Sequence, residues 1–306
     1  MASDLNELSR LEDSLTYLYI DKAAIERDEN SIAVFREKER IPIPISSLTV
    51  LMLGPGTSIT HAAMQIAAES GCMVIWCGEN ALRFYGYGMG ETRSAEHILQ
   101  QAKHCMDEEM HMQVVRRMFQ LRFPDMNLDG LTLNQIRGME GVRVRESYKL
   151  YAKKHHVTWN GRVYDPSDWD ASDALNRAMS SANVCLYGLC NAAIISLGYS
   201  PAIGFVHTGK MQSFVYDIAD LYKMETSVPA AFEVAGSSKQ EDISRTTRIV
   251  MRRYLRERRI LKRIAEDLFF IFGNVEDEDR NREDAGELWN NDNTTTAGGV
   301  NHAGDV

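Results

Sequence analysis

Residues 48–78 read LTVLMLGPGTSITHAAMQIAAESGCMVIWCG, and this stretch sets the architecture of the first part of the chain. The apolar run Leu48–Leu53 predicts a buried strand, and the Gly-Pro-Gly turn after it favours a helix that opens near Thr57 or Ser58. A second apolar run, Cys72–Cys77, predicts another buried strand after that helix. This order of elements indicates a sheet interrupted by one helix.

Shorter apolar runs on either side extend the pattern. Leu15–Ile20 and Ile32–Phe35 precede the stretch, separated by polar turns, and Arg83–Tyr87 follows it as one more short strand. The first ninety residues therefore predict a small β-rich region with a single helix.

Long helical stretches replace the strands from Ser94 onward, because nothing after Tyr87 alternates convincingly with a period of two residues. We expect these helices at Ser94–Phe123, Leu133–His155, Asp173–Leu197, Ile218–Ala235 and Ile243–Phe272. The Gly-rich segment at residues 86–93 has the backbone freedom of a hinge. The predicted fold class is α+β, with a β-rich domain at residues 1–88, a larger all-α domain at 89–275 and a tail at 276–306.

The formal net charge of −9 is unevenly distributed along the chain. Residues 276–306 hold nine acidic side chains against Arg280 and Arg282, which leaves residues 1–275 with a net charge of only −2. The tail is acidic and rich in Asn and Gly, so it cannot bury enough apolar surface to offset its ordering entropy. We predict that the tail is disordered.

A basic stretch at residues 245–263 holds nine Lys or Arg side chains and one acid, Glu257. Its arginines recur every three or four residues, which predicts one helical face. Such a face repels itself unless an anionic partner docks, either a nucleic-acid backbone or an acidic protein surface; a solvated face is the alternative. The predicted docking face, called the arginine stripe below, consists of Arg245, Arg248, Arg252, Arg256, Arg259 and Arg263.

Cysteine usage and hydropathy bear on location. The five cysteines form no CxxC pair, so we expect buried reduced thiols with neither zinc nor disulfides. No apolar run approaches the ~20 residues of a membrane-spanning helix, and the N-terminus lacks the basic-then-apolar order of a secretory signal. We therefore expect a cytoplasmic protein with no membrane partner.

The segment GFVHTGKMQSFVYDIADLYK, residues 204–223, carries most of the candidate chemistry. Asp217 and Asp220 stand three residues apart at the start of a predicted helix, so their carboxylates project from one face. His207 precedes them on a Gly-flanked turn, with Lys210 three residues later. Mg²⁺ and Mn²⁺ prefer carboxylate oxygens and tolerate one imidazole. The structural alternative is two acids at a helix start and a core histidine.

A third candidate ligand, Glu140, lies in the middle of a predicted helix in IRGMEGVRVRESYKL, residues 136–150. Arg137 and Arg143 stand three residues on either side of it, and more basic residues follow toward Lys154. An exposed glutamate in surface salt bridges is the alternative for this position.

Four segments, taken in order, resemble the CRISPR-associated integrase family of the adaptation machinery, the first-numbered Cas proteins, and are most similar to its bacterial type I-E. They are IRGMEGVRVRESY, VTWNGRVYDPSDW, SSANVCLYG and YSPAIGFVHTGKMQSFVYDIAD. The resemblance extends from LGPGTSITHAA to the arginine stripe, at residues 50–272.

The resemblance implies a set of site residues. The family's metal-binding glutamate, histidine and aspartate match Glu140, His207 and Asp220, with Asp217 and Lys210 as further catalytic residues of the same site. Expected DNA contacts are Arg83, Arg137, Arg143, Tyr164 and Tyr187.

The resemblance also implies an activity and partners. Family members are Mg²⁺- or Mn²⁺-dependent DNA endonucleases that insert short duplexes into the CRISPR array by attack of 3′-hydroxyls. They act as homodimers, and two dimers flank a dimer of the smaller second-numbered Cas protein in a hetero-hexamer. This chain departs from the family pattern at two places. Its tail is acidic, whereas the tail of relatives is proline-rich, and residue 58 is Ser, whereas relatives carry a basic residue there. A DNA-bridging scaffold without activity and a nucleotide-binding regulator built on Gly54–Thr60 are the competing hypotheses.

Overall fold

The computed structural model describes residues 17–36, 39–79, 83–88, 95–128, 130–159, 174–237, 242–273, 287–289 and 295–297. Contacts divide the chain into two units, Met1–Phe272 and Gly273–Val306. In the second unit, β9 (Glu287–Trp289) pairs antiparallel with β10 (Thr295–Ala297). The other residues of the predicted tail, and residues 89–94 at the predicted hinge, lie outside the described residues. The boundary between the β-rich and helical domains therefore stays a prediction.

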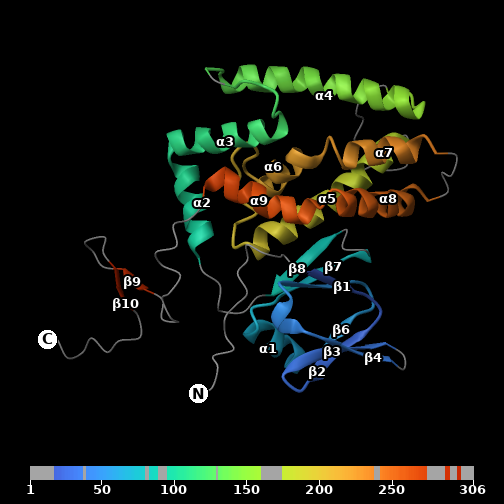
Figure 1. The fold of residues 1–306 in the computed structure, drawn as a ribbon, viewed down its shortest axis with the longest axis vertical. Helices are drawn as coiled ribbons and strands as arrows, with labels where there is room; N and C mark the ends of the chain where they lie inside the picture. The colour runs from blue at the N-terminus through green and yellow to red at the C-terminus, as the bar shows by residue number, and fades with distance from the viewer. Residues whose placement is uncertain are drawn as a thin grey trace. The chain divides into compact units, whose positions relative to one another are not determined.

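The described part of the first unit contains two four-stranded sheets (Figure 1). In the first sheet β1, β5 and β7 are parallel neighbours and β8 joins antiparallel to β7. In the second, β4, β3 and β2 are antiparallel and β6 runs parallel to β2. The strands are β1 (Tyr17–Ile20), β2 (Ala24–Asp28), β3 (Ser31–Arg36), β4 (Glu39–Ile43), β5 (Val50–Leu53), β6 (Ser58–Ile59), β7 (Met73–Cys77) and β8 (Phe84–Gly88); the 3₁₀ helix η1 (Ile45–Ser47) follows β4.

Every residue of β5 is buried, because both faces of its sheet are covered. Leu51 and Leu53 share a core with α1 (His61–Glu69) and the second sheet. Val50 and Met52 pack in a separate cluster with Ala192 and Ile195 of α5 (Ala174–Ser196). A strand buried on both faces has a continuous apolar run, which is the sequence pattern that predicted it.

Helix α1 begins at His61, later than the predicted start near Thr57 or Ser58. Ser58 and Ile59 form β6 and pair with β2, and Thr60 caps the helix by accepting a hydrogen bond from the N–H of Ala63 at 3.3 Å. The hydroxyl of Thr57 donates to the carbonyl of Ile20. Since these groups are used inside the protein, the turn is structural, and the nucleotide-binding hypothesis has no support in it.

Two of the five predicted helical stretches match single helices, and three are each divided in two. Two of the three breaks fall at local signals: the side chain of Asp107 caps α3, and Arg259, with φ at 50°, separates α8 from α9. Apolar residues recur at the same helical spacing on both sides of such a break, so periodicity alone does not reveal it. The helices are α2 (Glu96–Met106), α3 (Glu108–Arg122), α4 (Leu133–His155), α5, α6 (Ser213–Tyr222), α7 (Ser227–Ala235), α8 (Ile243–Glu257) and α9 (Ile260–Phe272).

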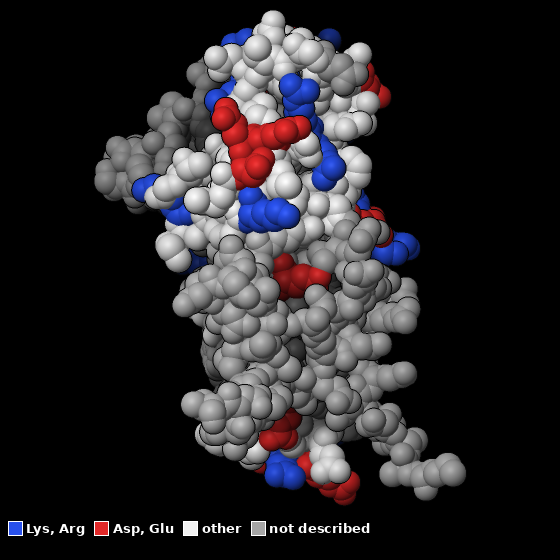
Figure 2. All heavy atoms as spheres, turned by 90° about the vertical axis from the view of Figure 1, so that its left-hand side faces the viewer, with Lys and Arg blue, Asp and Glu red and all other residues white. Residues whose placement is uncertain are grey.

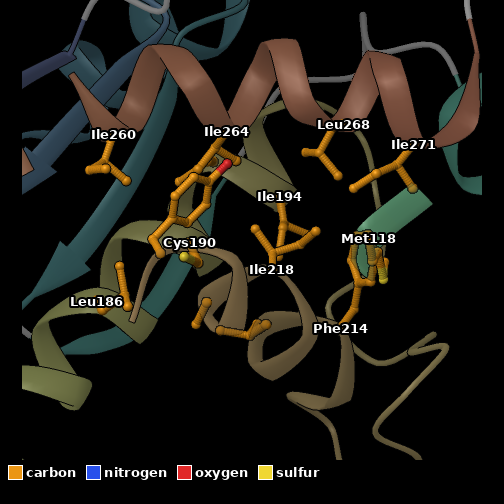
Figure 3. Close-up of a cluster of buried hydrophobic side chains, with 14 of the residues drawn as sticks. Met118, Leu186, Cys190, Ile194, Phe214, Ile218, Ile260, Ile264, Leu268 and Ile271 are labelled. Atoms are coloured by element: carbon orange, nitrogen blue, oxygen red, sulfur yellow. The ribbon is translucent and has the colours of Figure 1, made fainter. Parts of the chain in front are cut away.

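The helical core forms around α5, which packs against α6, α7, α8 and α9. Figure 3 shows one side of α9 pointing into this core, toward side chains from α3, α5 and α6. The labelled residues are Met118, Leu186, Cys190, Ile194, Phe214, Ile218, Ile260, Ile264, Leu268 and Ile271.

Helix α5 corrects the expectation that no apolar run is long enough to span a membrane. It has 23 residues, and its most apolar window has a mean hydropathy of 1.4. However, 67% of that window is buried inside the protein. Contacts with the surrounding helices and the first sheet account for this apolar surface, as is typical of a core helix.

The thiols allow a test of the described packing. Four cysteines are buried and Cys105 is partly exposed, and none of the five is in a disulfide. Burial raises the pKa of Cys77 to about 11 and that of Cys185 to about 12, so at pH 8 fewer than about one in a thousand of either is a thiolate. We expect one thiol per folded chain, Cys105, to react rapidly with a disulfide reagent at pH 8, as peptide mass spectrometry would show. Rapid labelling of a second cysteine would contradict this packing.

Candidate functional site

Asp217, on α6, organises the turn that carries His207. Its carboxylate is 3% exposed and accepts hydrogen bonds from the backbone N–H groups of Phe205 at 2.6 Å, Val206 at 3.1 Å and His207 at 2.8 Å. Nδ1 of His207 lies 2.7 Å from the same carboxylate, and this hydrogen bond raises the pKa of the imidazole. Because Nδ1 donates to Asp217, Nε2 is left as the ring nitrogen available to ligands or protons.

Further contacts hold the same turn. A Cβ on Gly204 would lie 2.2 Å from the carbonyl oxygen of His207, so a larger residue does not fit there. Gln101 of α2 is fully buried and donates to carbonyl groups of the preceding loop. His111 of α3 places Nε2 2.8 Å from the carbonyl of Phe205. The position of His207 is therefore fixed by three helices.

Glu140 and Asp220 meet at one cation, Arg122. Its guanidinium forms an ion pair with Glu140 of α4 and lies 3.8 Å from the carboxylate of Asp220 on α6. Asp220 also lies 2.6 Å from Nζ of Lys223. Burial raises the pKa of Glu140, Arg122 lowers it and the Asp220 carboxylate raises it. Charged groups from α3, α4 and α6 thus converge in a partly buried place.

A cavity of about 20 Å³ lies at this convergence, large enough for one water-sized species. His207, Asp217 and Asp220 line it together with Arg122, and the imidazole of His207 lowers the pKa of nearby Glu140. The structure thus brings the three predicted metal ligands within electrostatic reach of one another. The remaining lining is apolar and consists of Met118, Phe119, Val206 and Leu221.

The donor set fits a divalent cation in type and in charge. Two carboxylates and one imidazole suit Mg²⁺ or Mn²⁺, and a positive group, the Arg122 guanidinium, already lies between the carboxylates. Over the described ranges, no three His, Cys, Asp or Glu side chains are gathered closely enough to hold a metal ion. The oxygens of Asp217 are engaged by the His207 turn, so Asp217 fits an orienting role rather than that of a ligand.

A larger cavity of about 630 Å³ brings together residues predicted from distant segments. Arg83 and Tyr187, expected to contact DNA, line it with Arg248 of the arginine stripe. Tyr216 links it to the small cavity, because its ring centroid lies 5.0 Å from that of Tyr187 and 5.8 Å from that of His207. Arginines beside aromatic rings suit a nucleic-acid strand.

The other predicted site residues have simpler surroundings. Lys210 is exposed, with its main chain hydrogen-bonded to Ser213. Arg137 is exposed and lowers the pKa of Glu140, and Arg143 lies 3.5 Å from Asp125. Tyr164 lies outside the described residues.

The arginine stripe is not one continuous helical face. The helix ends at Glu257 and a new one begins at Ile260, so Arg259 lies at the junction. Two stripe members have acidic partners that the sequence did not predict: Arg248 pairs with Glu79 at 3.2 Å and Arg263 with Glu225 at 2.7 Å. Arg245, Arg252 and Arg256 are exposed on α8. The role of the stripe as a docking surface stays a prediction.

Basic and acidic side chains also lie next to each other on the face in Figure 2, so no field of one sign extends over the described part of that face.

Three residues near the site were missed from the sequence. Lys223 follows Asp220 by three residues, a helical spacing that could have identified it. Tyr216 adjoins Asp217 in the segment that was singled out. Arg122 stands in RRMFQLRF, residues 116–123, and no spacing in that segment links it to the other site residues.

Comparisons with known proteins identify the family of this chain. The sequence model of the family described as CRISPR associated protein Cas1 matches residues 16–128 and 126–265. CRISPR-associated endonuclease Cas1 2 of Thermus thermophilus is 46% identical over 310 residues, covering 99% of this chain and 95% of the relative. CRISPR-associated endonuclease Cas1 of Escherichia coli K12 is 42% identical over 255 residues, covering 83% of each, which fits the predicted type I-E.

A crystal structure of TtCas1 in complex with DNA is similar in fold, with a TM-score of 0.80 and 47% identity. The match covers 87% of this chain and 99% of that one. By the length of the family match and by these identities, the chain belongs to the CRISPR-associated Cas1 family.

Proposed function

We propose that the protein is a CRISPR spacer-acquisition integrase, a divalent-metal-dependent DNA endonuclease and strand transferase that inserts short foreign duplexes into the CRISPR array. The observation that carries the proposal is the convergence of Glu140, His207 and Asp220 beside one small cavity, which His207 and Asp220 line. Relatives named as endonucleases, one of them similar over nearly the whole chain, support the same reaction class.

Glu140, His207 and Asp220 would hold Mg²⁺ or Mn²⁺. When bound, such an ion neutralises charge on the phosphate, lowers the pKa of an attacking hydroxyl and stabilises the departing oxygen.

The protein's own residues position the reacting groups. Asp217 fixes the imidazole so that Nε2 of His207 would be available to help hold the metal or to accept a proton from the 3′-hydroxyl. Lys210 is exposed and offers an ammonium group to the phosphate. Arg83, Tyr187 and Tyr216 line the larger cavity and would hold the incoming strand by its phosphates and bases.

The proposed partners are double-stranded DNA, as incoming spacer and as CRISPR array, a second copy of this chain, and a bridging dimer of the smaller second-numbered Cas protein. The assembly would be a hetero-hexamer in the cytoplasm. Family membership supports these partners, and a relative has been solved with DNA.

The proposal is tested by incubating the protein with a short duplex, supercoiled array DNA and Mn²⁺, with and without the smaller Cas partner. We expect joined products that require the divalent ion. DNA binding without nicking or joining at any divalent-ion concentration would replace the integrase with the DNA-bridging scaffold.

A salt titration tests the exposed arginines of α8. Replacing Arg252 and Arg256 with Ala should flatten the slope of log affinity against log salt by ~0.9 for each lost phosphate contact, because fewer counterions are released on binding. DNA binding by fluorescence anisotropy between low and physiological salt measures this slope.

The control for the titration replaces Arg253 and Lys262, two basic residues outside the arginine stripe that change the charge equally and pair with Glu233 and Glu266. Their slope should stay close to that of the unmodified protein. If the slope of the Arg252 and Arg256 variant is also unchanged while co-purification of the smaller Cas partner is lost, the surface binds protein rather than DNA.

A further inference from the structure

Arg122 is a member of the site that the sequence did not predict and that the proposed reaction does not use. Its side chain is 13% exposed, pairs with Glu140 and lies 3.8 Å from Asp220. Its Nε is buried and has no hydrogen-bond partner within the described part of the chain. Buried donors are normally satisfied, so the unpaired Nε–H is an exception. The guanidinium is therefore held mainly by its charge and only in part by hydrogen bonds.

The charge of Arg122 has a clear effect on the two carboxylates. Glu140 and Asp220 come from different helices and are each about one-fifth exposed, so with nothing between them they would repel each other. Lys223 lies 2.6 Å from Asp220, but it is the Arg122 guanidinium that pairs with one carboxylate and lies beside the other, so it offsets the repulsion between them. A divalent cation would need the same carboxylate oxygens, so the guanidinium and the metal ion compete for them.

We propose that Arg122 occupies the cation position between Glu140 and Asp220 until the metal binds, and that the metal then displaces its guanidinium onto a phosphate oxygen of the DNA. The inference rests on the proposed metal-dependent function. Arg122 would then be a positioning residue before the metal arrives and a substrate-binding residue afterwards.

Two features of the site favour this exchange. Arg122 lines the small cavity together with His207 and Asp220, so rotation of its long side chain leaves the guanidinium beside the reacting groups. A planar guanidinium also binds phosphate through paired hydrogen bonds, for which its unused Nε–H is available.

Metal affinity without DNA tests the first half of the proposal. Mn²⁺ binding is measured by electron paramagnetic resonance for the unmodified protein, R122Q and the control R143Q. Arg143 lies on α4 near the site, but its acidic partner is the exposed Asp125. We expect R122Q to bind Mn²⁺ about tenfold more tightly, because a competing cation is removed, and R143Q to change the affinity less than about twofold. Added methylguanidinium should weaken Mn²⁺ binding to R122Q.

DNA affinity at saturating Mn²⁺ tests the second half. R122Q should bind a short duplex more weakly than the unmodified protein and lose ~0.9 from the salt slope, whereas the control R253Q, whose arginine pairs with Glu233, should keep the slope of the unmodified protein. Equal duplex affinity and salt slope for R122Q and the unmodified protein would overturn the transfer to phosphate.

Two controls separate failure of this inference from failure of the proposed function. If E140Q and D220N bind Mn²⁺ as well as the unmodified protein does, the proposed metal site is wrong. If they lose binding but R122Q has an unchanged Mn²⁺ affinity, the exchange is wrong and the metal site stands.

Should R122Q fail to fold, the ¹⁵N resonance of Arg122 Nε in the unmodified protein, assigned with R122K, gives the answer. We expect it to shift when a diamagnetic divalent ion, Mg²⁺, is added, and a resonance that does not respond would overturn the exchange.

Discussion

Glu140→Gln should lower the rate of strand transfer by at least about 100-fold, and His207→Ala and Asp220→Asn should have effects of the same order. Each change removes a group that would hold the metal where charge develops on the phosphate. The glutamine and asparagine variants keep the shape of the side chain, so the loss should appear in the rate more than in folding. Single-turnover joining of a labelled duplex to supercoiled array DNA at saturating Mn²⁺ measures it.

A matched control comes from the same helix. Glu146 of α4 is exposed and pairs with Lys149 at 2.9 Å, so Glu146→Gln changes the charge equally without touching the site and should join DNA at the normal rate. Because the three ligands act as a unit, the double variant E140Q/D220N should be little slower than either single variant. Normal integration by all three single variants would refute the assignment.

Asp217→Ala should destabilise the folded protein by about 3 kcal/mol or more and abolish joining as well. The change leaves the buried N–H groups of Phe205, Val206 and His207 without their acceptor, at about 1–3 kcal/mol each and not fully additive. It also frees the imidazole that Asp217 holds. Equilibrium unfolding in urea measures the free energy of unfolding.

Asp125→Ala is the control for stability: Asp125 is 85% exposed, so its replacement should lower the free energy of unfolding by less than about 0.5 kcal/mol.

Asp217→Asn separates the role of Asp217 in holding the turn from its role in holding the imidazole, because it keeps the shape of the side chain and one carbonyl acceptor. Since the hydrogen bond with Asp217 is the largest cause of the raised His207 pKa, this variant should lower that pKa, so the imidazole loses its proton at a lower pH in metal-free protein. An unchanged imidazole titration by NMR would contradict the orienting role.

The sequence predicted the elements well where the signals are local. Helix α4 begins and ends at the predicted residues because Thr132 and Gln135 form a capping box and His156 adopts a left-handed conformation after the last turn. Strand β5 was found because both of its faces are buried. Divided helices were missed where a single capping side chain or one positive φ decides the break.

The site was harder to predict, because its members are joined only in space. Spacing linked Asp217 to Asp220, whereas Glu140 was a candidate with a surface alternative, and the family resemblance favoured its place in the site. Nothing in the sequence connects Arg122 to residues 18 and 98 positions later, so the ion pairs of Glu140 and Asp220 could be found only from coordinates.

The burial of β5 on both faces has a practical consequence for building hybrid proteins. The small side chain of Ala192 and the branched one of Ile195 fill the layer against Val50 and Met52. A chimera that exchanged only the strands with those of a relative would place its junction inside this apolar layer, where mismatched volumes are poorly tolerated. A chimera should therefore include the turns of α5 that face the sheet together with the strands of the sheet.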